Sequence, residues 1–236
     1  MPFDPLSVVG LVVAGHEGDQ VPMGTCFRFR HADLVLTAAH CVPDVDRLYA
    51  VFPRLGQAEI VAHVERHPQA DIAALTIGPL NATEGYPENA FWDRVSNWSL
   101  GEEAFAYGYP VEGPALRDAS TPTPRLFVGH YQRFFDYESH NGFRYLAGEL
   151  SFPAPGGLSG GPVFRQGAPQ MVTGMVTTSH ESYAITDSVD EINDDGSVLR
   201  IEGRKVITYG IALMLSGVSD WLHEVTPDVP GMGWVS

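Results

Sequence analysis

Basic residues are scarce in this chain. It has 14 Lys and Arg against 29 Asp and Glu among 236 residues, a formal net charge of −15. Proteins that bind nucleic acid neutralise its phosphates with clustered Lys and Arg, so nucleic acid is not an expected partner. We interpret the charge first as a solvated, self-repelling surface, with attraction of basic peptide segments as the alternative.

Cysteine and long apolar runs are also scarce. Cys26 and Cys41 are the two cysteines, and they could pair across neighbouring strands or remain reduced, so the disulfide is left open. The N-terminus lacks a basic segment, and the apolar run Val8–Ala14 is too short and too interrupted to span a membrane. We therefore expect no membrane partner and a cytoplasmic location, where cysteines stay reduced.

Charged residues make up only 18% of the chain, while 18 prolines and 25 glycines are spread along it. This composition favours many short strands joined by turns over long surface helices. Apolar or alternating runs bounded by Gly, Pro or Asp predict six strands of an N-terminal barrel, at about residues 7–82. These runs are Val8–Val13, Thr25–Phe29, Leu34–Thr37, Leu48–Val51, Ala58–His63 and Ile72–Ile77.

A connecting loop is expected at about residues 83–101, followed by a second β-rich series at about residues 102–215. Apolar residues at 218, 221, 222 and 225 have helical spacing and predict a C-terminal helix at about residues 216–225. The expected fold is all-β, with two packed six-stranded antiparallel barrels in one domain, 1–236. The second series comprises Glu103–Tyr107, Arg125–Phe135, Phe143–Phe152, Val163–Phe164, Met171–Thr177 and Val206–Leu213.

A polar insertion, Ser179–Arg204, interrupts the second series. An Asp-Gly pair within Asn193-Asp194-Asp195-Gly196 is flanked by strand-like residues and predicts a protruding hairpin. A calcium-binding loop is the alternative, but its acidic residues do not follow the spacing of a helix-flanked calcium loop.

Three short segments supply the groups for nucleophilic catalysis. Ser159 lies among glycines, His40 and Asp71 precede it, and a serine hydroxyl is nearly inert without such a base. The Gly-x-Ser-x-Gly spacing also occurs in α/β-hydrolases, where a helix follows the serine and the chain order is serine, acid, histidine. Here Gly160-Gly161-Pro162 follows and the order is histidine, aspartate, serine, which disfavours that class and an esterase-like hydrolase.

These segments resemble the motifs of trypsin-like serine peptidases with the chymotrypsin fold, and bacterial members in particular. Thr37-Ala38-Ala39-His40-Cys41 matches the histidine motif, and Asp71-Ile72-Ala73 resembles the aspartate motif. Gly157-Leu158-Ser159-Gly160-Gly161-Pro162 matches the serine motif at all positions but one. The resemblance implies a serine endopeptidase that cuts polypeptides through an acyl-enzyme intermediate, without metal or cofactor. It implies His40 as base, Asp71 as its orienting partner and Ser159 as nucleophile, with the Gly157 and Ser159 amides as oxyanion hole.

The resemblance also implies where the substrate binds. Leu158 replaces the aspartate that captures the new N-terminus of animal trypsins, so activation by that ion pair is not expected. Pro153 replaces the aspartate that selects Lys or Arg, which implies a neutral pocket for a small or medium apolar residue. The implied substrate-binding residues are Pro153, Val176, Thr177, Thr178, Ser179 and Gly210.

Two other interpretations remain. A catalytically silent peptide-binding module on the same fold is the main alternative, because residues alone do not establish geometry. His63 and His67 could share a metal ion only on a helix, whereas the surrounding sequence predicts a strand, so no metal site is expected. A regulatory protein partner is possible because an unregulated cytosolic protease would be hazardous.

Overall fold

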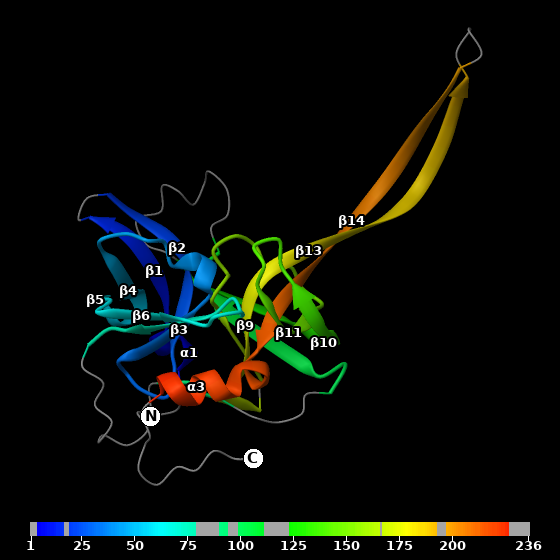
Figure 1. The fold of residues 1–236 in the computed structure, drawn as a ribbon. Coiled ribbons are helices and arrows are strands. Elements are labelled where there is room, and N and C mark those ends of the chain that lie inside the picture. Colours follow the sequence, from blue (N-terminus) through cyan, green and yellow to red (C-terminus); the bar gives the residue numbers. More distant parts are fainter. Residues whose placement is uncertain are drawn as a thin grey trace.

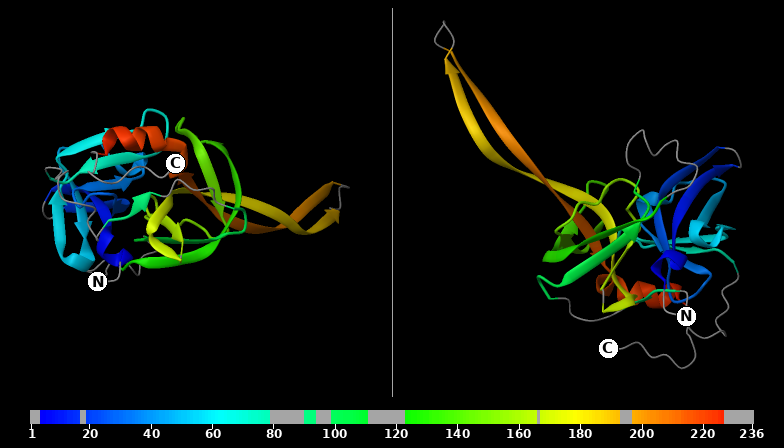
Figure 2. Two further views of the ribbon diagram at one scale, coloured as in Figure 1. Left: turned by 90° about the horizontal axis from the view of Figure 1, so that it is seen from below. Right: turned by 180° about the vertical axis from the view of Figure 1, so that it is seen from behind.

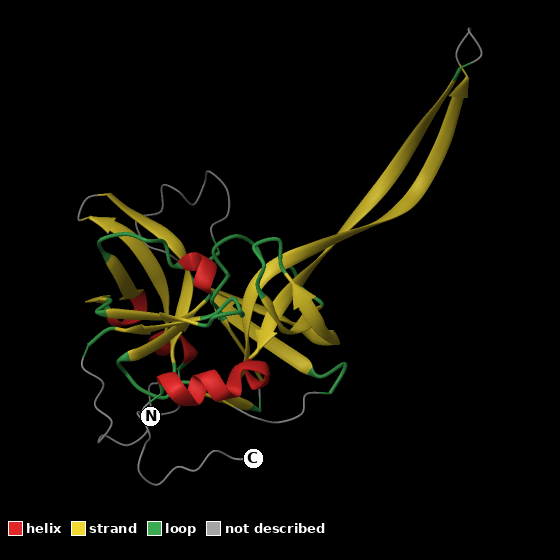
Figure 3. Cartoon of the chain, in the orientation of Figure 1, coloured by secondary structure: helices red, strands yellow, loops and turns green. Residues whose placement is uncertain are grey.

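The computed structural model describes residues 4–16, 19–78, 90–93, 99–110, 123–165, 167–192 and 197–226. Two mostly antiparallel sheets lie side by side, and a short C-terminal helix crosses beneath them in the view of Figure 1. Figure 3 shows that strands dominate the described chain. The predicted all-β, chymotrypsin-like fold class is confirmed, but each sheet has seven strands where six were expected, and the sheets are curled rather than closed barrels.

The first sheet has the strand order β5-β4-β1-β2-β3-β7-β6. The predicted strand Ala58–His63 is bent and forms two elements. At the bend, the Val61 amide donates to Leu48 O at 2.9 Å, and the Ala62 amide donates to Thr76 O at 2.7 Å. Consecutive amides thus bond to strands near opposite ends of this order, and the sheet curls round. Its strands are β1 (Val9–His16), β2 (Asp19–Arg28), β3 (Leu34–Thr37), β4 (Leu48–Phe52), β5 (Gln57–Ile60), β6 (His63–Arg66) and β7 (Ala73–Thr76).

The second sheet has the order β12-β9-β10-β11-β14-β13-β8, and β12 also pairs with β13. Sequence analysis missed β8, a two-residue strand inside the segment expected to be a connecting loop. It is too short to show an alternating pattern, and its parallel pairing with β13 is a tertiary contact. The strands are β8 (Trp92–Asp93), β9 (Glu103–Gly108), β10 (Arg125–Glu138), β11 (Arg144–Leu150), β12 (Pro162–Arg165), β13 (Ala168–Ile192) and β14 (Val198–Met214).

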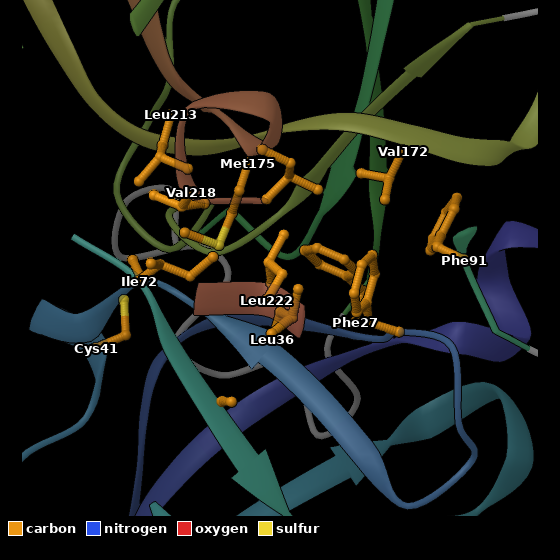
Figure 4. Close-up of a cluster of buried hydrophobic side chains, with 14 of the residues drawn as sticks. Phe27, Leu36, Cys41, Ile72, Phe91, Val172, Met175, Leu213, Val218 and Leu222 are labelled. Atoms are coloured by element: carbon orange, nitrogen blue, oxygen red, sulfur yellow. The ribbon is translucent and has the colours of Figure 1, made fainter. Parts of the chain in front are cut away.

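An apolar cluster joins the two sheets. Phe27 and Leu36 come from the first sheet, Met175 and Leu213 from the second, and all four are fully buried (Figure 4). Burial of such side chains stabilises a fold by about 1.5–3 kcal/mol each. The shared cluster fixes the position of one sheet against the other, so residues carried by different sheets can form one site.

Short helices tie the ends of the described chain to this core. Helix α3 (Ser219–Val225), which follows the 3-10 turn η3 (Leu215–Val218), confirms the predicted C-terminal helix. Its Trp221 ring meets the His67 ring edge-on at 5.4 Å, so the helix packs on the loop after β6. At the other end, α1 (Pro5–Val8) is capped by the Asp4 side chain, which accepts from the Leu6 amide at 3.0 Å. No helix in the described ranges is long and apolar enough to cross a membrane.

Strands β13 and β14 continue far beyond the second sheet as a two-stranded arm (Figure 2). They remain paired from Gly174 with Met214 to Ile192 with Val198. The predicted protruding hairpin is therefore present, and its two strands are direct continuations of β13 and β14. Its expected turn, Asn193-Asp194-Asp195-Gly196, lies outside the described residues, as does the calcium-loop alternative that depends on it.

Candidate active site

His40 and Asp71 are brought together by pairing of β3 with β7. Thr37 lies opposite Ala73 in that pairing, so the turn after β3 and the loop before β7 are neighbours. His40 lies in the 3-10 turn η1 (Ala39–Cys41). Its Nδ1 is 2.7 Å from Asp71 Oδ2, and its backbone amide donates to Asp71 Oδ1 at 3.0 Å. Both carboxylate oxygens therefore hold the same histidine.

The electrostatics of this pair favour the protonated ring. Burial by itself lowers the pKa of His40, but the hydrogen bond to Asp71 and the neighbouring Cys41 together raise it well above 6.5. The Asp71 side chain is 7% exposed and that of His40 is 35% exposed. A buried carboxylate thus stabilises the imidazolium that forms once the neutral ring has accepted a proton, and the partly exposed ring can be reached by a reacting group, as a general base requires.

Ser159 lies in a tight loop before β12. The Leu158 amide donates to Pro155 O at 3.0 Å, and Gly157 at the third position of this turn has φ 88°. A type II turn requires such a positive φ, which glycine adopts without strain. The amides of Gly157 and Ser159 donate to no described residue. The loop therefore offers two unbonded N–H groups beside the serine, the requirement for an oxyanion hole.

Gly160 allows this loop to approach the first sheet. It has φ +85°, and a Cβ there would lie 2.5 Å from Thr37 Oγ1 and closer still to the Thr25 carbonyl. Its amide donates to Val176 O at 2.7 Å. Any side chain at this position would push the serine loop away from the first sheet and from His40.

The hydroxyl of Ser159 donates to the carbonyl of Thr177 at 2.8 Å. The proton of the expected nucleophile is therefore directed to β13 in this structure. Exposed side chains change rotamer within picoseconds to nanoseconds, and the Ser159 residue is partly exposed. Rotation about one bond is sufficient to redirect the hydroxyl.

Thr25 is a buried residue of the site that sequence analysis did not single out. Its amide donates to Ser159 O at 2.8 Å, and its hydroxyl donates to Gly157 O at 2.7 Å. The same hydroxyl accepts from the Tyr109 amide at 3.0 Å. A threonine in a predicted strand is unremarkable in sequence, and these three partners become neighbours only when the two sheets pack.

Leu158 is fully buried, in a cluster with Ala106, Val163 and Met214 of the second sheet. Its Cδ1 also lies close to Gly108, where a Cβ would come within 2.8 Å of it. Leu158 therefore packs against apolar side chains at the position where, by the family resemblance, animal trypsins carry the aspartate of an ion pair.

The segment implied to line the primary pocket is bridged to β13. The Ser179 hydroxyl donates to Ala154 O at 2.8 Å and accepts from the Ala154 amide at 2.9 Å. The Gly210 amide donates to Phe152 O at 2.6 Å, and a Cβ on Gly210 would lie 2.8 Å from that oxygen. Little space remains between the 152–155 segment and the paired strands β13 and β14.

The other implied pocket residues fall in different places. Val176 is fully buried in the core of the second sheet, whereas Pro153 is exposed. The Thr177 side chain is also buried, and its hydroxyl donates to Ile211 O at 3.1 Å and bonds Tyr145 at 2.9 Å. Thr178 is half-buried, with its hydroxyl on Ser179 O at 3.4 Å. The structure therefore brings Ser179 and Gly210 together, while Val176 contributes to packing.

The two cysteines and the histidines once considered as metal ligands, His63 and His67, lie outside the candidate triad. Cys26 and Cys41 are both buried free thiols, so the structure contains the reduced alternative. His67 Nδ1 accepts from the backbone amides of residues 69 and 70, which shapes the loop leading to Asp71. His63 lies on strand β6, 3.5 Å from Glu65, and no cluster of metal-ligating side chains occurs within the described ranges.

Residues 24–175 match the family model described as the trypsin-like peptidase domain. This match covers more than half of the chain, which therefore belongs to the trypsin-like peptidase family, and its class is serine-type endopeptidase. No curated protein matches the sequence.

Several solved structures with the same fold are bacterial proteases. The active form of the Rv3671c protease from M. tuberculosis has a TM-score of 0.64 and 15% identity, covering 98% of this chain and 85% of that one. The MamO protease domain from Magnetospirillum magneticum has a TM-score of 0.59 and 15% identity, and the match covers 95% of this chain and 98% of that one. The HtrA-type protease AlgW with a tripeptide has a TM-score of 0.62 and 15% identity, and the match covers 93% of this chain and 60% of that one. At this identity the similarities establish the fold.

Proposed function

We propose that Ser159, His40 and Asp71 form the catalytic triad of this endopeptidase. The observation that carries the proposal is the 2.7 Å contact of His40 Nδ1 with Asp71, formed beside a serine loop that presents two unbonded amides. The carboxylate holds the imidazole in the tautomer whose Nε2 can accept a proton. The first sheet thus supplies His40 and Asp71, and the loop before β12 of the second sheet supplies Ser159 and the two amides.

In the proposed reaction, His40 Nε2 accepts the Ser159 proton as Oγ bonds to the substrate carbonyl carbon. The Gly157 and Ser159 amides stabilise the oxygen that becomes negative. The C–N bond then breaks, and His40 donates its proton to the leaving amine. Water, activated by His40, attacks the acyl-enzyme and releases the carboxylic acid, while Ser159 regains its proton.

We further propose that the residue before the cut is small and uncharged. The support is the Ser179 hydroxyl, which bridges both backbone groups of Ala154 and narrows the pocket entrance. Gly210, bonded to Phe152 O, leaves no room for an added Cβ behind it. An alanine or serine side chain fits this space better than an arginine, for which the segment offers no carboxylate.

A fluorophosphonate probe tests the triad directly. We expect modification at Ser159, located by peptide mass spectrometry, and none in the Ser159→Ala and His40→Ala variants. A fluorogenic panel that varies the residue before the cut should rank alanine above leucine, and both above arginine. Preferred cleavage after arginine or lysine would contradict the proposed pocket.

The alternative of a silent peptide-binding module has one observation in its favour. The Ser159 hydroxyl donates to the Thr177 carbonyl, so it is not poised on His40 in this structure. A module of this kind would bind peptides on β13 yet resist the probe under every condition. Binding that is equal for wild type and Ser159→Ala, without labelling of wild type, would support it over the peptidase mechanism.

A further inference from the structure

The arm formed by β13 and β14 begins at the expected substrate strand. Thr177 and Ser179 belong to the same strand as Tyr183 and Ile185 of the arm, with no break in its pairing to β14 other than bulges. β12 covers one edge of β13 as far as Met175, and Gly160 and Gly161 bond to the same edge at Val176. From Thr177 onward, β14 is the one described strand that pairs with β13, and no backbone group of a described residue bonds to the other edge, which we call the free edge.

The hydrogen-bonding pattern identifies which backbone groups face this free edge. Ser179 lies opposite Gly210, but the Gly210 amide bonds to Phe152 O and not to Ser179. The two residues therefore form a non-hydrogen-bonded pair, in which backbone groups point away from the partner strand. Alternate residues repeat this arrangement, so the N–H and C=O groups of Glu181 and Tyr183 also face the free edge.

Apolar side chains stand exposed next to this edge. Tyr183 is 63% exposed and Ile185 56% exposed, and they share a face with Val206, which is 58% exposed. A two-stranded hairpin in water has marginal stability, whereas a third strand would pair the free backbone groups and cover these side chains. The arm is therefore a two-stranded sheet whose free edge could pair with a third strand.

The charge of the arm is divided between its strands. From Ser179 to Ile192, β13 contains Glu181, Asp187, Asp190 and Glu191 and no Lys or Arg. The basic residues lie on β14, where Arg200 pairs with Asp190 at 2.8 Å. A chain added beside β13 would thus lie against carboxylates and would be favoured by basic residues.

We propose that the arm is a docking strand for the substrate segment N-terminal to the cut, which adds antiparallel to β13. The proposal rests on the proposed function, and its direction follows the antiparallel pairing of β13 with both β12 and β14. Recognition of this kind uses backbone hydrogen bonds for affinity and alternate side chains for specificity.

The register follows from the position of Ser159. Its Oγ is 2.8 Å from Thr177 O, so the residue before the cut lies beside Thr177. With a two-residue repeat, the fifth residue before the cut lies opposite Glu181, the seventh opposite Tyr183 and the ninth opposite Ile185. The preferred substrate is therefore an extended segment with a basic fifth residue and apolar seventh and ninth residues.

Peptide binding to the Ser159→Ala protein tests the docking strand without requiring turnover. The probe is fluorescein-labelled Ile-Ser-Val-Thr-Lys-Thr-Val-Thr-Ala followed by Ser-Leu, compared by anisotropy with a version shortened to four residues before the cut. We expect the long peptide to bind at least about tenfold more tightly, and extension after the cut to add nothing. Equal affinities, or a gain only from extension after the cut, would overturn the proposal.

Proline substitutions distinguish the two edges of the arm. In the same background, Tyr183→Pro removes an N–H at the free edge of β13 and should abolish the advantage of the long peptide. Val206→Pro is the matched control, because Val206 lies opposite Tyr183 and its N–H points to the far edge of β14. Equal losses in the two variants would contradict docking on β13.

A charge reversal tests the register. Glu181→Lys should weaken binding of the lysine peptide and strengthen binding of a peptide with glutamate at the fifth position, whereas Glu191→Lys, beyond the ninth residue, should change neither. A second copy of this chain could pair with the free edge in place of a substrate, and sedimentation of the same proteins tests for this. A dimer of the Ser159→Ala protein that is lost on Tyr183→Pro would overturn the proposal. Fluorophosphonate labelling of wild type reports the proposed function separately, because docking is measured without Ser159.

Discussion

Thr25 of the first sheet holds Gly157 of the serine loop. The Thr25 hydroxyl donates to Gly157 O at 2.7 Å across a sequence separation of 132 residues, and the Thr25 amide donates to Ser159 O. These bonds fix the carbonyl groups of two peptide units, the one that follows Gly157 and the one that follows Ser159. The sheet that carries His40 and Asp71 thus also sets the orientation of the loop that carries the expected nucleophile.

We expect Thr25→Val to disturb the position of the serine loop, although valine has nearly the same shape as threonine. The substitution leaves Gly157 O and the Tyr109 amide without their buried partner, a cost of about 1–3 kcal/mol for each unsatisfied group. Activity on short peptides and the rate of fluorophosphonate labelling should both fall. Thr25→Ser retains the hydroxyl and should keep most of both rates. If Val and Ser variants behave alike, the hydroxyl does not position the loop.

The raised pKa of His40 predicts activity that increases with pH. Only the neutral ring can accept the Ser159 proton, so kcat/KM should rise with a midpoint above 6.5. Asp71→Asn removes the charge that stabilises the imidazolium, so it should move this midpoint to lower pH and reduce kcat by about 10⁴-fold. The exposed Asp136 provides the control, because Asp136→Asn should leave the pH profile unchanged. A profile identical in Asp71→Asn would refute the assigned role of Asp71.

The same shift has a consequence for stability. Because the folded-state pKa of His40 is raised, protonation of the ring stabilises the fold fully below the unfolded pKa near 6.5. This contribution is lost as the pH rises through the higher folded-state pKa. The free energies of unfolding of wild type and His40→Gln, measured with urea across this pH range, should converge at alkaline pH. Curves that stay a constant distance apart would show that the ring makes no titrating contribution.

Packing of Leu158 should replace activation through a new N-terminus. Leu158→Ala removes a fully buried side chain, so we expect a loss of about 2–5 kcal/mol in the free energy of unfolding, together with reduced activity. Leu126→Ala, at a largely exposed position, is the matched control and should change stability by less than about 0.5 kcal/mol. Removal of residues 1–7 should not raise activity. A many-fold increase on truncation, with Leu158 unimportant, would instead support an activation switch.

Opening the primary pocket should change which residue is accepted before the cut. Ser179→Gly removes the hydroxyl that bridges Ala154, so cleavage after leucine or phenylalanine should gain relative to alanine by about tenfold or more. Ser182→Gly, farther along the same strand, should leave the ranking unchanged. The fluorogenic panel measures both variants, and an unaltered ranking in Ser179→Gly would show that another group limits the pocket.

Local patterns in the sequence predicted the fold class because they are set by local chemistry. Leu34–Thr37 is an apolar run whose predicted bounds match β3, and Ser219–Val225 has the apolar spacing of a helix. The bend at Val61 was not predicted, because it depends on amides that bond to Leu48 and Thr76, on strands near opposite ends of the sheet. Strand β8 was missed for a similar reason, since two residues form a strand only through their partner.

For this protein, the sequence alone determined the family motifs, the strand-rich fold and the presence of a protruding hairpin, because each depends on residue type and short spacing. Only the tertiary structure showed that Thr25 holds Gly157, that the Ser179 hydroxyl bridges the backbone of Ala154, and that the hairpin continues the strand beside Ser159. These relationships join residues far apart in the chain, so they depend on how the two sheets pack and on which backbone edges that packing leaves open.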